Sequence, residues 1–464
     1  MNADKDKLSF SKDTPMKIGR VLVTLLLTFL AIICFTPTAW AFCGFYVAKA
    51  DTKLYNKVSQ VVIARDGDRT VLTMANDYQG NVKDFALVVP VPVVLKQEQV
   101  HIGEPKIIER LDAFSAPRLV EYFDEDPCAV NRYRMEDRMP MSAAPAAQES
   151  ANKISDRSLG ITVESRFSVG EYDIVILSAK ESNGLETWLI RNGYKIPKGA
   201  KQLLQPYIKQ KLKFFVAKVN LEKFDSAGYQ QLRPIMMAYE SPRFMLPIRL
   251  GMVNSTNEQD LIVYILSPKG QAEITNYRTV KVPSDPEIPV FVKNEFADFY
   301  KAMFQTSYTQ EGKKVAFLEY AWDMSNCDPC SAEPLSPEEL KQAGVFWLDR
   351  QPSSQPNFVF PPSNTTFITR LHVRYSRDKF PEDLMFQATS NRESFQGRYV
   401  MRHPFTGEMK CEAGRQYKKS LSQRLEREAQ TLAKLTGWNI QEIRKKAKVV
   451  STQPTSWWEN LWSK

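Results

Sequence analysis

The residues best suited to chemistry in this sequence are cysteines, and their most distinctive arrangement is Cys327-Asp328-Pro329-Cys330. A C-x-x-C pair between a strand and a helix is typical of thioredoxin-like redox sites, where the helix N-terminus lowers the pKa of the first thiol. Here the pair follows a strand predicted over residues 315–322 and precedes a helix that begins near Ser336. Because that helix begins about six residues after Cys330, its dipole acts only weakly on the sulfur. We interpret Cys327 and Cys330 first as structural cysteines, and second as the nucleophile and resolving thiol of a thiol-disulfide oxidoreductase.

Three further cysteines, Cys43, Cys128 and Cys411, fit the structural interpretation. With the C-x-x-C pair they make five disulfide candidates, so at most two bonds form within the chain and one thiol is left over. The simplest arrangement staples the C-x-x-C loop to Cys128 and Cys411. A metal site would need a third and a fourth ligand, and His403 with Cys411 is the nearest set in sequence. We favour disulfides and predict neither a metal nor another cofactor.

Other groups that could do chemistry are few. The chain has only three histidines, His101, His372 and His403, and this scarcity argues against catalytic triads and zinc hydrolases. It contains no phosphate-binding loop, dinucleotide fingerprint, nucleophile elbow or helical zinc motif in the usual sequence forms. For His372 and His403 we expect buried or hydrogen-bonded structural roles. Asp124-Glu125-Asp126 could supply oxygen ligands to calcium, but an acidic triplet beside proline is more often a solvated turn.

The N-terminal segment has the three-part layout of a secretory signal peptide. Basic residues up to Arg20 precede an apolar run over residues 21–35, and Ala39-Trp40-Ala41 supplies the small residues of a cleavage site after Ala41. An uncleaved anchor is the alternative, although this run as a helix reaches only about 22 Å of a roughly 30 Å hydrocarbon core. We predict export to the periplasm or cell envelope, with membrane association if the signal is kept. In an oxidising compartment of that kind, disulfides persist.

The positive charge sits at the two ends of the chain. The net charge is +9, of which residues 1–41 carry +2 and residues 412–464 carry +6, so residues 42–411 carry only +1. A nearly neutral body argues against binding along a nucleic-acid backbone, and we predict no nucleic-acid partner.

The C-terminal region differs in kind from the rest. Leucines and alanines from Leu421 to Leu435 recur at three- and four-residue spacing, which predicts an amphipathic helix ended by Gly437, and a shorter helix follows over residues 439–447. The last residues include Trp457, Trp458 and Trp462. We expect these indoles to dock on the protein's own surface, with peripheral membrane contact or a protein partner as alternatives.

The remaining elements are mostly strands. Residues 58–65 and 69–74 flank Asp66-Gly67-Asp68, which predicts a hairpin. Residues 84–95 read as a buried strand that must end, bend or become an edge at Pro90 and Pro92. Further strands are predicted over 172–177, 212–219, 245–253, 261–266, 279–282, 315–322, 366–375 and 384–388. Helices are predicted over 185–191, 200–211 and 295–304.

Strands that outnumber helices and follow one another favour an α+β fold with mainly antiparallel sheets. The order along the chain suggests five parts. These are a signal peptide over 1–41, a β-rich region over 42–133, a mobile linker or loop over 134–157, an α+β region over 158–411 and a basic helical tail over 412–464.

Several motifs together resemble one bacterial exported family, called domain of unknown function 2330. They are CGFYV at 43–47, DFALVVPVP at 84–92, YFDEDPC at 122–128, RFMLPIRL at 243–250, WDMSNCDPC at 322–330 and RYVMRHPFTG at 398–407. The resemblance covers most of residues 42–411 and implies a bacterial, exported, cysteine-braced protein, but it assigns no catalytic residue. We therefore expect a non-enzymatic envelope protein, a disulfide-braced binding or structural module for an envelope component or a protein partner.

Overall fold

The computed structural model describes twelve stretches of the chain. They are residues 45–48, 55–56, 59–75, 78–79, 85–129, 161–192, 200–226, 232–253, 258–326, 328, 332–348 and 366–448. Several predicted features lie outside them: the signal segment 1–41, Cys43, the stretch 134–157, Cys327, Cys330, Trp457, Trp458 and Trp462.

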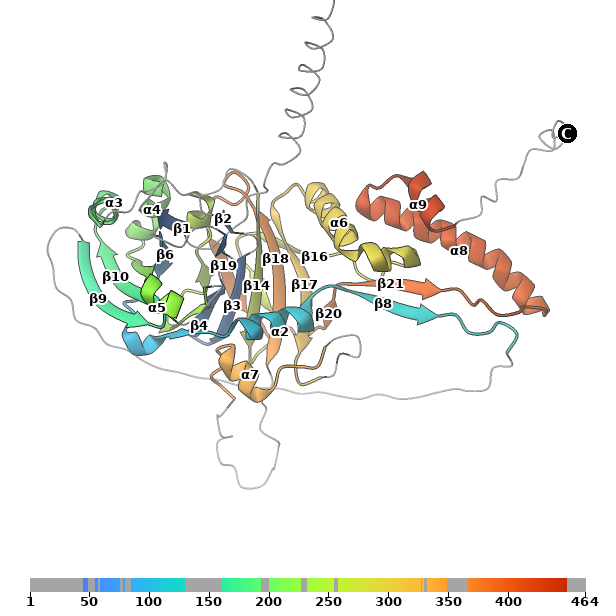
Figure 1. Cartoon of the computed structure of the whole chain (residues 1–464), viewed down its shortest axis with the longest axis horizontal. Helices are drawn as coiled ribbons and strands as arrows, with labels where there is room; N and C mark the ends of the chain where they lie inside the picture. The colour runs from blue at the N-terminus through green and yellow to red at the C-terminus, as the bar shows by residue number, and fades with distance from the viewer. Residues whose placement is uncertain are drawn as a thin grey trace, which may run out of the picture. The chain divides into compact units, whose positions relative to one another are not determined.

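The α+β expectation is confirmed, and two sheets form the centre of the structure (Figure 1). The five-stranded sheet has the order β1 (Phe45–Ala48), β6 (Phe85–Val91), β11 (Lys213–Val219), β10 (Tyr172–Ala179) and β9 (Ile161–Val169). The nine-stranded sheet has the order β16 (Arg278–Lys281), β17 (Val315–Asp323), β18 (Phe367–Tyr375), β14 (Gln259–Ser267), β3 (Ser59–Asp66), β4 (Arg69–Ala75), β12 (Ile235–Glu240) and β7 (Val100–Ile102), with β20 (Phe395–Gln396) on β17. Only the β3–β14 and β16–β17 pairs in these sheets are parallel.

Smaller pairings complete the strands. A three-stranded sheet joins β13 (Met245–Leu246), β19 (Leu384–Ala388) and β15 (Ala272–Ile274), and a short pair joins β2 (Tyr55–Asn56) to β5 (Tyr78–Gln79). A parallel ribbon joins β8 (Arg118–Phe123) to β21 (Arg398–His403).

The described residues form eight α-helices and three 3₁₀ helices. They are α2 (Pro105–Ser115), α3 (Ser182–Arg191), α4 (Ala200–Lys209), α5 (Leu221–Ser226), α6 (Phe296–Gln310), α7 (Pro337–Gln342), α8 (Glu412–Thr436), α9 (Ile440–Lys446), η1 (Gln97–Gln99), η2 (Arg249–Val253) and η3 (Val290–Glu295). Among the described residues, none of these helices combines the length and the apolar character that a membrane crossing needs.

The two large sheets share one core. Apolar side chains from β6, β10 and β11 form a single cluster with those from β3, β4, β14 and β18, so the sheets face each other across it. The outer side of the five-stranded sheet is covered by α3 and α4. The outer side of the nine-stranded sheet is covered by α2 and α7 at one part and by α6 and α8 at another. Figure 1 shows α3 and α4 beside the first sheet and α6 beside the second. Strands β14, β17 and β18 are therefore covered on both faces.

This arrangement corrects the division of the chain into regions. From the sequence we expect the stretch 134–157 to separate a β-rich region from an α+β region. However, β6 from before it pairs with β11 from after it, and β3 pairs with β14. Because strands from both regions share both large sheets, the two regions fold as one body and are not separate domains.

Other local expectations have mixed outcomes. The hairpin β3–β4 is confirmed, with Gly67 at φ 57° in its turn. Strand β6 ends at Val91, one residue before Pro92. The strand predicted over 245–253 is wrong beyond Leu246, because the Asp383 carboxylate accepts hydrogen bonds from the Ile248 and Arg249 amides and η2 forms there instead.

The helix caps agree well with the sequence signals. The Ser336 hydroxyl oxygen accepts a hydrogen bond from the Glu339 amide, and the Glu339 carboxylate accepts one from the Ser336 amide, which makes the expected start of α7 a capping box. Gly437 ends α8 in the left-handed conformation, and Asn439 caps α9. Helix α8 is longer than predicted because it begins at Glu412, directly after Cys411.

Gly344 provides a test of how tightly α7 is packed on the nine-stranded sheet. Its φ is +96°, and a Cβ added there would lie 2.7 Å from Val71 Cγ1 on β4. Gly344→Ala combines a left-handed backbone with this clash, so we predict a loss of about 2–4 kcal/mol in the free energy of unfolding. Gly67→Ala is the matched control: φ is +57°, but nothing lies within 4 Å of its added Cβ. In urea unfolding, Gly67→Ala should lower the free energy of unfolding by only about 1 kcal/mol. Equal losses for the two variants would contradict this packing.

Candidate functional site

The most unusual chemistry among the described residues is a row of charges buried on β18. Arg370, His372 and Arg374 alternate along this strand and share its helix-covered face with Ile368, while the intervening residues fill the core between the sheets. Three carboxylates face this row: Asp112 from α2, Glu319 from β17 and Asp260 from β14. We call these six residues the charge ladder.

A bulge in β17 aims Glu319 at the ladder. The pairing register with β18 shifts between Leu318 and Tyr320, so Glu319 is the extra residue. Its carboxylate accepts hydrogen bonds from Arg370 Nε at 2.6 Å and from the Tyr300 hydroxyl, and lies 2.8 Å from His372 Nδ1. The side chain is 1% exposed. Burial by itself raises the pKa of Glu319, but the charges of His372 and Arg370 outweigh it and lower that pKa to about 2.

The other end of His372 meets Asp260. His372 Nε2 lies 3.0 Å from Asp260 Oδ1, and the same carboxylate binds Arg374 through two nitrogens, Nε at 2.8 Å and Nη2 at 2.9 Å. The His372 ring stacks on Phe304 of α6 with 3.8 Å between ring centroids. Burial opposes ionisation of Asp260, yet His372 and Arg374 together lower its pKa well below the usual range.

The ladder reaches the protein surface at Asp112. Arg370 Nη1 donates to Asp112 Oδ1 at 2.7 Å, and its guanidinium lies over the Tyr264 ring. The Tyr264 hydroxyl donates to the same Asp112 oxygen at 2.9 Å. Asp112 is 44% exposed, whereas Arg370 is 7% exposed. Three cations and three anions thus compensate one another when His372 carries a proton.

This geometry decides what His372 can do. An ionised carboxylate only accepts hydrogen bonds, so a ring with a carboxylate at each nitrogen has to donate from both and is an imidazolium. Burial lowers the pKa of His372, but the Glu319 charge and the hydrogen bonds to Asp260 and Glu319 raise it above its ordinary value. An imidazolium held in this way has no lone pair for proton abstraction or metal binding. The ladder therefore fixes α2, α6 and three strands to one another instead of forming an acid–base site.

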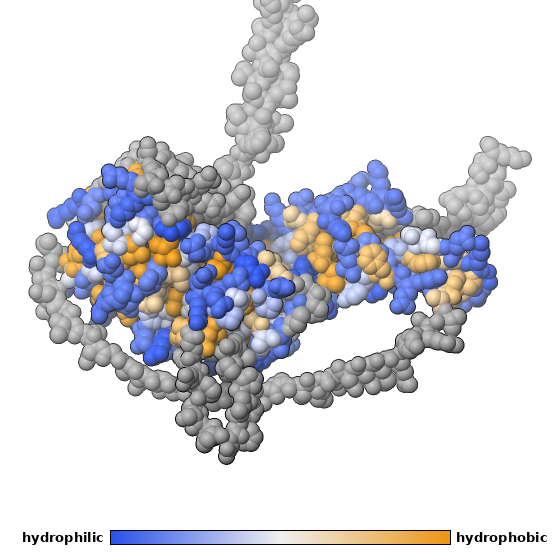
Figure 2. Space-filling model, turned by 60° about the horizontal axis from the view of Figure 1, so that its bottom comes forward, coloured by the Kyte–Doolittle hydropathy of each residue, from blue (hydrophilic) through white to orange (hydrophobic). Residues whose placement is uncertain are grey.

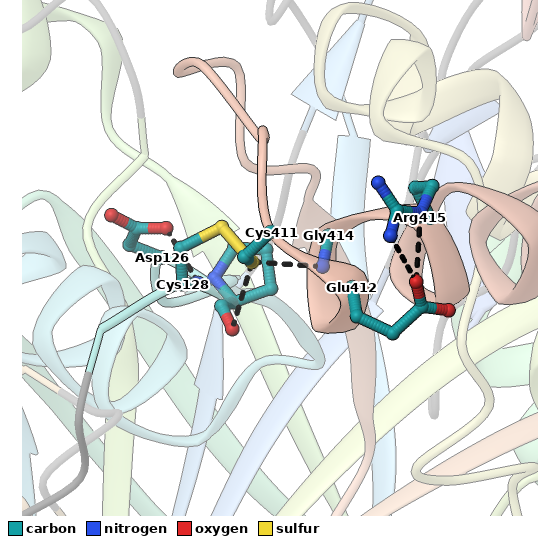
Figure 3. The surroundings of a disulfide bond; sticks show 7 residues. Asp126, Cys128, Cys411, Glu412, Gly414 and Arg415 are labelled. Carbon is teal, nitrogen blue, oxygen red and sulfur yellow. Dashed lines mark hydrogen bonds and ion pairs between the residues drawn. A yellow bond between two sulfur atoms is a disulfide. The ribbon is translucent and has the colours of Figure 1, made fainter.

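A second constellation fastens the C-terminal helices to the ribbon β8–β21. Cys128, which follows β8, forms a disulfide with Cys411, the residue that caps α8, with 5.9 Å between their Cα atoms (Figure 3). Cys411 Sγ accepts a hydrogen bond from the Gly414 amide at 3.2 Å, and the Cys128 amide donates to Asp126 Oδ1 at 2.8 Å. The bond joins positions 283 residues apart.

Ion pairs reinforce this covalent link. Asp124 accepts hydrogen bonds from Arg424 Nη1 at 3.0 Å and from the Tyr417 hydroxyl at 2.5 Å, both on α8. One turn further along α8, Ala429 and Leu432 enter the apolar cluster formed by α6 and β21. Helix α8 is thus held by a disulfide at its start and by apolar packing near its end.

Glu428 is a buried carboxylate of this constellation that lacks hydrogen-bond partners among the described residues. It is 1% exposed, Arg424 Nε lies 3.3 Å from Oε1, and within the described ranges neither of its carboxylate oxygens accepts a well-aligned hydrogen bond. Burial is the main cause that raises the pKa of Glu428 to about 7; Arg424 lowers it, and the Glu287 and Asp124 charges raise it.

The disulfide corrects two sequence-based alternatives. Because Cys128 and Cys411 are bonded to each other, neither is available to the C-x-x-C loop, and Cys411 cannot join His403 as a metal ligand. His403 instead contacts Glu121 at 2.8 Å and stacks on Phe123. Two of the acidic residues considered as calcium ligands have partners within the protein: Asp124 accepts a hydrogen bond from Arg424, and Asp126 accepts one from the Cys128 amide. Within the described ranges no three or more His, Cys, Asp or Glu side chains are grouped to hold a metal.

The C-x-x-C pair itself lies outside the described residues, but the aspartate between its cysteines does not. Asp328 is buried, and its Oδ2 accepts hydrogen bonds from the Tyr320 hydroxyl at 2.9 Å and from Gln396 Nε2 at 2.7 Å. These contacts anchor the motif to β17 and β20. The tryptophans Trp457, Trp458 and Trp462 also lie outside, so their predicted contacts stay predictions.

Sequence reasoning missed the ladder although one signal was present. Arg370, His372 and Arg374 alternate within a strand that is otherwise apolar, which indicates a strand buried on both faces with charges on one of them. The carboxylates that compensate them are 51 to 258 residues away in sequence, and only the fold brings them together.

The ladder makes His372 a sensitive position. His372→Leu removes a cation and leaves Glu319 and Asp260 undercompensated, so we predict a loss of about 3–5 kcal/mol in the free energy of unfolding. Because the folded pKa of His372 is raised, this contribution is complete below about pH 6.5 and is lost as pH rises through the folded value, so urea unfolding at pH 6 is the suitable measurement. His101→Leu is the control, since His101 is exposed, and should change stability by less than about 0.5 kcal/mol. Similar effects of both variants would contradict the ladder.

Glu428 leads to the opposite kind of prediction. Its raised folded pKa means that the carboxyl is tolerated while protonated and destabilises the fold as pH rises through about 7. Glu428→Gln should therefore be neutral near pH 4.5 and stabilising by up to about 3 kcal/mol at pH 8, measured by chemical unfolding across this range. Glu426 is the control, because Arg444 lowers its pKa by a hydrogen bond. Glu426→Gln should show no gain at high pH; a gain there, or none for Glu428→Gln, would refute the assignment.

Comparison with known proteins places the chain in a family without assigned chemistry. A family model described as an uncharacterized protein conserved in bacteria matches residues 37–387. No curated protein and no solved structure matches the chain significantly. The matched range includes the ladder and all strands of the two large sheets except β20. It ends before β20, β21, Cys411, α8 and α9, and so stops short of the extent suggested by the motifs. The chain belongs to the family of uncharacterized bacterial proteins designated DUF2330.

Proposed function

We propose that this protein is a non-enzymatic module of the bacterial cell envelope that binds or supports another envelope component. The disulfide Cys128–Cys411 is the observation that carries the proposal. Disulfides of this structural kind persist in exported proteins and are rare in a reducing cytosol. Residues 1–41, with the layout of a secretory signal, agree with export.

The position of the disulfide supports a bracing role. The bond connects the end of the ribbon β8–β21 to the start of α8 and closes a loop of 283 residues. A disulfide that closes a long loop stabilises the folded state by about 2–5 kcal/mol. The bond is also combined with the Asp124–Arg424 pair and with the apolar contacts of α8. A brace of this kind fixes the orientation of the helical extension, which a binding or structural module requires.

The charge ladder supports a non-enzymatic role. Catalytic acids and bases need an ionisable group poised near the working pH and open to substrate. The ladder instead pairs each buried charge, and His372 is enclosed by two carboxylates and Phe304.

The alternative, a thiol-disulfide oxidoreductase, needs an activated Cys327. Helix α7 begins at Pro337, ten residues after Cys327, and its first amides are already satisfied by its own capping box. Among the described residues, α7 therefore does not supply this motif with the free helix N-terminus that lowers the thiol pKa in thioredoxin-like sites.

Cysteine chemistry in the native protein tests the proposal. We expect protein recovered from the envelope fraction to begin at Phe42 and to yield a Cys128–Cys411 linked peptide in non-reducing mass-spectrometric mapping. Cys330→Ala should trap no mixed disulfide between Cys327 and another exported protein, with Cys43→Ala as the matched control. An intact N-terminus with reduced Cys128 and Cys411 in the cytosol would refute the proposal, and a trapped mixed disulfide specific to Cys330→Ala would establish the oxidoreductase instead.

A further inference from the structure

The helical extension α8–α9 carries most of the net positive charge of the chain beyond residue 41. Residues 412–448 contain ten basic and four acidic residues, a net charge of +6, whereas residues 42–411 carry only +1. On the side of the molecule shown in Figure 2, hydrophilic residues cover much of the described surface and separate the apolar patches. The charges of the body are thus nearly balanced, and the excess is concentrated in these two helices.

The fold sorts the charges of α8 between its two faces. Its buried residues include Gly414, Glu428, Ala429 and Leu432. Of these, Ala429 and Leu432 belong to the apolar cluster with α6 and β21. From Arg415 to Lys434 the exposed residues are all basic or neutral, without one carboxylate: Arg415, Gln416, Lys418, Lys419, Ser420, Gln423, Arg427, Gln430 and Lys434. We call this surface the basic face.

Of the basic residues on this face, only Arg415 is paired with an acid of the extension among the described residues. Glu412 pairs with Arg415 and Glu426 with Arg444, and Glu428 is buried. Glu442 is the exposed carboxylate on α9, where it is accompanied by exposed Lys445 and Lys448. Within the part of the chain that the structure describes, Lys418, Lys419, Arg427 and Lys434 form no ion pair. Their charges are therefore available to an external anion.

We infer that the basic face of α8 docks the protein on the headgroups of an anionic phospholipid bilayer. Several cations on one rigid face match a planar array of phosphates, and each Lys or Arg near such a surface strengthens attraction by about fivefold. The disulfide and the Asp124–Arg424 pair hold the face in a fixed orientation. A nucleic acid fits less well, because residues 42–411 carry a net charge of only +1 and thus no basic excess that would follow a duplex. After Lys448 the sequence supplies Trp457, Trp458 and Trp462, a residue type that favours the membrane interface.

This inference names a partner for the proposed envelope module, and the test for it does not depend on export or on cysteine mapping. The probe is flotation of the full oxidised chain with vesicles of phosphatidylcholine alone or with about one third phosphatidylglycerol, at about 0.1 M and about 1 M salt. We expect binding only to the anionic vesicles and only at the lower salt concentration. Lys418, Lys419, Arg427 and Lys434 all replaced by Gln should weaken this binding at least about tenfold.

A matched control neutralises four exposed lysines elsewhere: Lys106, Lys180, Lys201 and Lys209 replaced by Gln. The control should bind the anionic vesicles as the unmodified chain does, and both quadruple variants should keep its melting temperature because all eight positions are exposed. Absence of binding by the unmodified chain, equal loss in both quadruple variants, or full binding by the α8 variant would each overturn the inference. The inference would also be overturned if binding were lost when residues 449–464 are removed but kept in the α8 variant. Displacement of the vesicles by duplex DNA at equal phosphate concentration would overturn it as well.

Discussion

The covering of the nine-stranded sheet on both faces is the constraint from which the rest of the structure follows. Strands β14, β17 and β18 lie between the shared core and the helices α2, α6 and α7, so a charge on them has to find its partner inside the protein. Arg370, His372 and Glu319 meet this demand through a bulge that turns Glu319 toward β18. The resulting contacts connect α2 at Asp112 with α6 at Phe304 and so determine where two helices sit on the sheet.

The C-terminal extension is joined to this body by a different set of interactions. Strand β21 continues the fold as the parallel partner of β8, and α8 is held at Cys411 by a covalent bond and at Leu432 by apolar packing. The family match ends before this part. In this chain the surface of this extension is basic and rigidly held, and we propose that it determines where the protein docks.

Much of the fold could be predicted from local signals, whereas the candidate sites could not. The β3–β4 turn at Gly67, the capping box at Ser336 and the end of α8 at Gly437 all depend on a few neighbouring residues, and the sequence predicts each correctly. The strand expected over 245–253 fails because Asp383, far away in sequence, captures the backbone amides. The disulfide and the ladder depend on pairs separated by up to 283 residues. Such pairs follow from topology, which single-chain patterns do not contain.

The protonation state of His372 tests the account most directly, because a compensated ladder and a catalytic base require opposite states. Nitrogen-15 NMR of the native protein, assigned with His372→Gln, reports whether one or both ring nitrogens carry a proton. The account predicts that His372 is protonated at both Nδ1 and Nε2 at neutral pH. A His372 ring that is neutral at pH 7 would contradict it, and would reopen the case for acid–base chemistry on β18.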